Sequence, residues 1–81
     1  MALDVRLHVK GELPHEVNAR FDREPGYGDL VQPATGGGCW WRIEGTSAST
    51  GRTRRYALVL HSGEGCRITP GRWTIRDPLA E

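Results

Sequence analysis

The stretch LDVRLHVK, residues 3–10, alternates apolar and charged side chains with a period of two. Such alternation is typical of a β-strand with one buried face and one face in water. Gly11 ends this run, and Pro14 lies in the connection that follows. A second alternating run at residues 17–21 then completes an antiparallel hairpin whose loop has roughly five residues.

After this hairpin, the pattern of the remaining sequence predicts further short strands and no helix. Residues 23–38 hold two prolines and a triple glycine, which predict a long irregular loop with room for a short strand near residues 29–31. Strand patterns return at residues 39–44, 52–61, 66–69 and 72–76, with a loop of small residues at 45–51. Tyr56 to Leu60 is apolar on both faces, which predicts a strand covered on both sides.

Six short strands in 81 residues predict an all-β fold in a single small domain. We expect antiparallel strands in a partly open barrel, of the size of SH3 and OB domains, or in a compact two-sheet sandwich. The barrel is favoured because closure removes edge strands that promote aggregation. The domain is expected to span residues 1–76, with 77–81 as a tail. The core of so small a domain is thin, so a site is expected on a surface, rim or shallow groove.

Whether Cys39 and Cys66 are free thiols or form a disulfide depends on whether the protein resides in a reducing or an oxidising compartment. The N-terminal alternation does not suit the apolar part of a secretory signal, and no apolar run is long enough to span a membrane. We therefore expect a cytoplasmic protein whose cysteines are free thiols on the buried side. For an exported protein, a disulfide between adjacent strands is the alternative.

Charge is distributed unevenly along the chain, although the net charge is only +1. Residues 1–38 hold four basic and six acidic side chains, whereas residues 39–76 hold seven arginines against Glu44 and Glu64. The first segment therefore carries −2 and the second +5. We interpret this asymmetry as the most informative functional feature of the sequence.

Strand alternation predicts which arginines lie together. If Trp41, Ile43 and Trp73 face inward, with Cys39, Ile68 and Ile75, the arginines between them face outward beside Trp40. Either Arg54 or Arg55 joins this face, depending on the register. The candidate binding residues are Trp40, Arg42, Arg54, Arg55, Arg67, Arg72 and Arg76.

An arginine-rich face with an exposed tryptophan suits two kinds of partner. The leading hypothesis is a non-enzymatic binding module that engages the acidic surface of a protein partner, with Trp40 as an apolar anchor. The alternative is nucleic-acid binding by the same face, where arginines contact phosphates and the aromatic ring stacks on bases. The simplest interpretation is an ordinary solvated sheet face, because outward positions must be polar. Self-association of the acidic and basic segments is a further hypothesis.

Metal and catalytic chemistry have weaker support in the sequence. The histidines and cysteines lack the paired, two- to four-residue spacing of structural zinc sites, so we expect no metal and no cofactor. His8 and His61 are expected on the wet face. A small nuclease or hydrolase would need a base, an acid and a cation, for which His61, Glu44 and the arginines are candidates. We expect no enzyme.

Overall fold

The structure is a computed structural model that describes residues 3–12, 15–47 and 53–76. Six strands and no helix occur in these residues. None of the described segments is therefore a helix that could cross a membrane. The strands are β1 (Leu3–Val9), β2 (Val17–Phe21), β3 (Leu30–Pro33), β4 (Trp40–Ser47), β5 (Arg55–Ser62) and β6 (Gly71–Ile75). The all-β prediction is confirmed.

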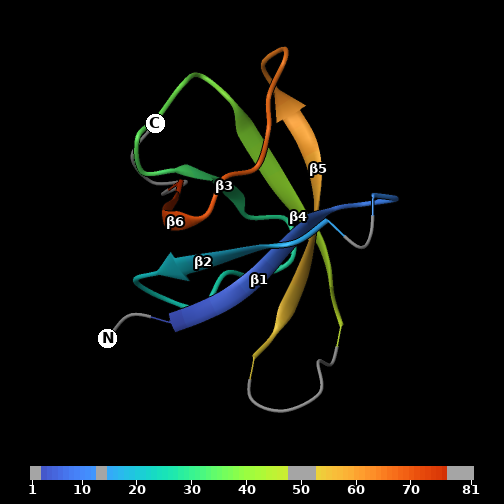
Figure 1. Cartoon of the computed structure of the whole chain (residues 1–81), viewed down its shortest axis with the longest axis vertical. Helices are drawn as coiled ribbons and strands as arrows, with labels where there is room; N and C mark the ends of the chain where they lie inside the picture. Colours follow the sequence, from blue (N-terminus) through green and yellow to red (C-terminus); the bar gives the residue numbers. More distant parts are fainter. Residues whose placement is uncertain (1–2, 13–14, 48–52, 77–81) are drawn as a thin grey trace.

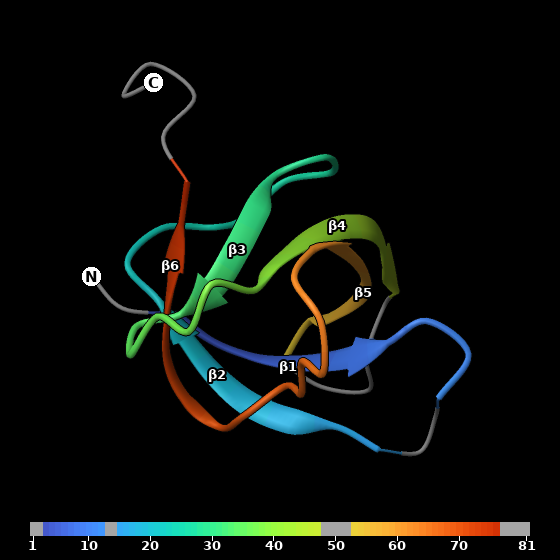
Figure 2. The same ribbon diagram turned by 90° about the horizontal axis from the view of Figure 1, so that it is seen from above.

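The strands close into a small barrel in the order β1-β2-β6-β3-β4-β5 (Figures 1 and 2). The hairpin predicted from residues 3–21 is present, with Leu3 opposite Phe21 and Leu7 opposite Val17. Closure confirms the barrel over the sandwich. Four of the six pairings are antiparallel, but β1 with β5 and β2 with β6 run parallel. Alternation within a strand carries no information about the direction of its neighbour, so the sequence predicted antiparallel pairs throughout.

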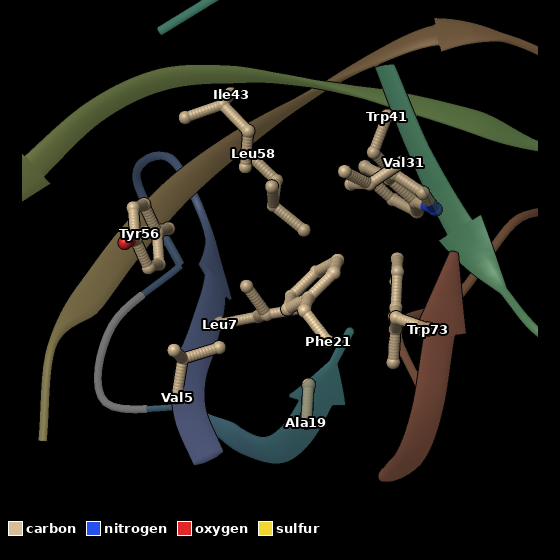
Figure 3. Close-up of a cluster of buried hydrophobic side chains, with 10 residues drawn as sticks. All are labelled: Val5, Leu7, Ala19, Phe21, Val31, Trp41, Ile43, Tyr56, Leu58 and Trp73. Carbon is tan, nitrogen blue, oxygen red and sulfur yellow. The ribbon is translucent and has the colours of Figure 1, made fainter. Parts of the chain in front are cut away.

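The barrel interior is filled by apolar side chains from all six strands (Figure 3). Trp41, Ile43 and Trp73 are buried there, as their alternation predicted. Phe21 packs against Trp73 with ring centres 6.4 Å apart. Ile68, Ile75 and Cys66 are partly buried against this core. The core consists of Val5, Leu7, Ala19, Phe21, Val31, Trp41, Ile43, Tyr56, Leu58 and Trp73.

Several segments differ from the sequence predictions. The irregular loop does contain the short strand that the sequence allowed near residues 29–31, but this strand, β3 (residues 30–33), pairs with both β4 and β6. Residues 66–69, predicted as a strand, pair with no other strand in the described chain. β4 continues to Ser47, beyond its predicted end. β5 is not covered on both sides, since Val59 is half-buried and Leu60 is 39% exposed. The predicted tail lies outside the described residues.

The cysteines form a disulfide, so the prediction of free thiols is wrong. Cys39 immediately precedes β4, and Cys66 lies in the connection from β5 to β6. This connection returns across the end of the barrel and brings the two Cα atoms within 6.1 Å, which is bridging distance. Both residues are half-buried. They do not belong to the fully buried core that the sequence predicted for them.

His8 is 8% exposed, although its position in β1 points outward. The sequence prediction of a wet histidine is therefore wrong. Arg55 lies opposite Arg6 across the parallel pair, and Glu16 precedes Val17, which lies opposite Leu7. The ion pair between Arg55 Nε and Glu16 Oε2, at 2.7 Å, consequently crosses β1 next to His8. Its long side chains account for the burial of the imidazole.

Candidate functional site

The predicted binding residues all face out of the barrel, but they do not form one patch. Trp40 and Arg42 lie on β4, Arg72 on β6 and Arg76 just after it. Arg54 immediately precedes β5, Arg55 is its first residue, and Arg67 lies in the β5–β6 connection. Trp40, Arg55 and Arg76 are half-buried, and the remaining four are exposed. A half-buried Trp40 agrees with the predicted orientation of β4.

Most of these arginines pair with carboxylates of the same chain. Arg54 pairs with Glu24, Arg55 with Glu16 and Arg72 with Asp22. These three ion pairs join the acidic first segment to the basic second segment, which the sequence analysis treated as separate. These pairs contribute little to stability, because their groups are largely or partly in water. Their larger effect is to neutralise the positive potential of these arginines, which the sequence suggested would attract an acidic partner.

One local cluster of aromatic and charged groups remains on the outer surface. In the β3–β4 pair Leu30 lies opposite Arg42, and in the β3–β6 pair Val31 lies opposite Ile75. Trp40 and Arg76 therefore flank the outer face of β3 from its two neighbours. The Arg76 guanidinium carbon lies 5.6 Å from the centre of the Trp40 ring, within range of a cation–π contact.

The loop before β3 adds Tyr27, which the sequence analysis missed. The Gly28 N–H donates to the Ile43 carbonyl at 2.8 Å, and the Ile43 N–H donates to the Asp29 carbonyl at 2.9 Å. This loop is thereby held against β4. The Tyr27 side chain is left 76% exposed. We call the cluster Tyr27, Leu30, Trp40, Arg42, Glu44 and Arg76 the outer patch.

Glu44 is the acidic member of the outer patch, and its pKa lies below the ordinary value. The main cause is the hydrogen bond from the Arg42 guanidinium, and the Tyr27 hydroxyl contributes further. Both partners stabilise the carboxylate form. The outer patch therefore holds two guanidinium groups and one ionised carboxylate at neutral pH.

The structure does not assemble the predicted hydrolytic residues. His61 and Glu44 lie on adjacent strands, but the β4–β5 register places them three to four residues apart along the ladder. This separation is about 10 Å, beyond the reach of a shared proton-transfer site. The described residues contain no group of three or more potential metal ligands. The cysteines are joined to each other, which leaves them unsuited to nucleophilic attack.

The chain was also compared with known proteins. No family model matches it, no curated protein matches it, and no solved structure matches it.

Proposed function

We propose that this domain is a non-enzymatic binding module that engages a protein partner through the outer patch. The observation that carries the proposal is the cation–π contact of Arg76 with Trp40, together with the exposed Tyr27 that lies by Glu44 at the other end of the outer patch. Tryptophan, tyrosine and arginine are the residue types that dominate binding energy at protein interfaces. The ordered strands around β3 hold them in place, which lowers the entropy lost on binding.

The partner surface is expected to carry carboxylates. The outer patch contains Arg42 and Arg76, and guanidinium groups form charge-assisted hydrogen bonds with carboxylates. A complementary acidic surface would speed association and orient the complex, while the apolar ring of Trp40 would provide the buried anchor.

Nucleic-acid binding stays the alternative prediction. Affinity for a polyanion depends on cations that replace counterions along the phosphate backbone. Four arginines predicted to serve this purpose, Arg42, Arg54, Arg55 and Arg72, already pair with carboxylates. A phosphate approaching Arg42 would also meet the charge of Glu44. The ion pairing therefore favours the protein partner.

The cytoplasmic location also stays a prediction, and the disulfide weighs against it. Cytosolic thiols are kept reduced, whereas bridges persist in oxidising compartments. We expect the domain to act where the bond between Cys39 and Cys66 is maintained.

The proposal is tested by affinity capture from source cells at physiological salt with the wild type and the Trp40→Ala variant. Arg54→Ala is the matched control, because Arg54 is exposed, ion-paired and outside the outer patch. We expect one or more proteins to be retained by wild type and Arg54→Ala. With the purified partner, Trp40→Ala should weaken binding roughly tenfold or more. Equal retention by all three folded proteins would exclude the outer patch as the interface.

A further inference from the structure

The connection between β5 and β6 contains a strand-like segment that has no strand beside it. From Cys66 to Thr69 the residues alternate between half-buried and exposed. In the described chain these residues join no ladder and make no backbone–backbone hydrogen bond. Their one recorded hydrogen bond is from the Trp73 indole N–H to the Thr69 carbonyl, at 2.8 Å. The segment thus has the side-chain pattern of a strand and an open backbone edge.

The beginning of β2, before Ala19, has an unpaired backbone edge as well. β2 pairs with β6 at two positions only, Ala19 with Gly71 and Arg20 with Arg72. Before Ala19, β2 has β1 on one side and no paired strand on the other in the described chain. Figure 2 shows the connection, in orange, on the side of the barrel where β2 lies. Two unpaired edges thus lie on either side of one opening in the barrel wall.

A cavity of about 430 Å³ lies between these edges. Its apolar lining includes Val17 of β2 and Ile68 of the connection, together with Val9 and Trp41. Trp41 is 3% exposed, and its indole nitrogen has no hydrogen-bond partner in the described chain. The volume lies within the range of ligand pockets. The apolar lining suits one or two aliphatic side chains.

The rest of the lining is polar or charged. Glu12, His15 and Glu16 come from the chain between β1 and β2, and Arg67 comes from the connection between β5 and β6. Arg67 is exposed and makes no ion pair or hydrogen bond within the described chain. A carboxylate in the cavity would be attracted to Arg67 and repelled by Glu12 and Glu16. An occupant with one acidic group would therefore bind in one orientation.

We propose that this opening binds an extended peptide segment of a partner protein, which adds as a strand between β2 and residues 66–69. Main-chain hydrogen bonds to the two open edges supply affinity, as in other cases of strand addition. An aliphatic side chain of the peptide occupies the lining around Trp41 and Ile68. An acidic residue next to it pairs with Arg67. The site shares no residue with the outer patch and goes beyond the proposed function.

The test begins with a random heptapeptide library panned against the purified, oxidised chain. We expect enriched peptides with alternating aliphatic residues and one aspartate or glutamate. Their synthetic versions should bind Arg67→Glu roughly tenfold more weakly than wild type, and exchange of the peptide's acidic residue for lysine should restore affinity. Arg20→Glu is the matched control, since Arg20 is exposed on β2 outside the cavity. It should bind as wild type does.

Backbone N-methylation of the peptide separates strand addition from binding by side chains alone. Because the peptide is paired on both sides, its alternate N–H groups face the two edges in turn, so methyl groups on either alternate set of nitrogens should abolish binding. The proposal is overturned if no peptide is enriched, or if methylation in either register has no effect. A peptide lost with Trp40→Ala but unaffected by Arg67→Glu would place the site on the outer patch and also overturn it. A dimer in sedimentation that Arg67→Glu disrupts would identify a second copy as the occupant instead.

Discussion

Gly63 lies where the disulfide leaves no space for a side chain. Its φ is +108°, and an added Cβ would lie 2.8 Å from Cys66 Sγ, 3.0 Å from Cys39 Sγ and 3.1 Å from Cys39 Cα. Contacts this short require movement of the bridge or the backbone. The glycine therefore serves both the turn after β5 and the packing of the disulfide.

Gly63→Ala should be more destabilising than the same change at Gly37. Gly37 has an almost identical φ of +107° but nothing within 4 Å of an added Cβ, so it reports the backbone cost alone. We expect Gly37→Ala to lower the free energy of unfolding by about 1–3 kcal/mol. Gly63→Ala should lower it measurably more, as determined by urea unfolding of the oxidised protein. Equal losses would show that the disulfide does not crowd this position.

The two buried indoles offer a second matched pair of substitutions. Trp73 is 1% exposed and donates to Thr69, whereas Trp41 is 3% exposed and its N–H has no partner in the described chain. Each change to phenylalanine removes similar volume, but only Trp73→Phe breaks a hydrogen bond. We expect Trp73→Phe to be less stable than Trp41→Phe by about 1 kcal/mol. Urea unfolding measures both, and the reverse order would contradict the hydrogen-bond assignment.

At the scale of single residues, side-chain direction was the property that the sequence predicted best. Trp41 is buried and Trp40 is not, as period-two alternation requires. His8 departs from this rule because Arg55 and Glu16 meet beside it from two different neighbours of β1. Such a contact depends on strand order, which alternation does not reveal.

Among the elements, the β5–β6 connection depends most on the disulfide. The bond joins Cys39 to Cys66, 27 residues apart, and fixes this connection to the beginning of β4. A closed loop of this length lowers the entropy of the unfolded chain. The small core makes this contribution a large share of total stability.

Replacement of both cysteines by serine should cost about 3–4 kcal/mol of unfolding free energy. The measurement is urea unfolding of the double variant against the oxidised wild type, with reduced wild type as a second comparison. Reduced protein and double variant should unfold at similar urea concentrations. Two reactive thiols in the folded, unreduced wild type would contradict the bridge.

The sequence predicted strands correctly where the apolar–polar alternation was long. The prediction was poor where a segment is a strand only because distant segments pair with it. β1 and β2 were found from their patterns alone. β3 has only four residues, lies between glycines and ends in Pro33. It is a strand because β4 and β6 pair with it on both sides. Residues 66–69 show the opposite case, since they alternate but have no paired neighbour in the described chain. Pairing between distant segments is a tertiary property that local patterns do not carry.

At the scale of the whole molecule, barrel closure brings the acidic segment (residues 1–38) and the basic segment (residues 39–76) together, so the basic segment is not left free for a partner. The sequence pointed to a basic segment available to a partner, but closure brings Glu16, Asp22 and Glu24 against arginines from residues 54–72. The candidate site could therefore be predicted only in part. Trp40, Arg42 and Arg76 belong to the outer patch, whereas Arg54, Arg55 and Arg72 form ion pairs across the fold.

The most direct test of this account is a titration of the purified protein with short single- and double-stranded DNA and RNA, at low and near-physiological salt. We predict no measurable binding at near-physiological salt, because the arginines serve ion pairs within the fold and a protein interface. Micromolar binding that persists at near-physiological salt and weakens steeply as salt is raised would contradict it, since such a slope reports arginines that are available to phosphates.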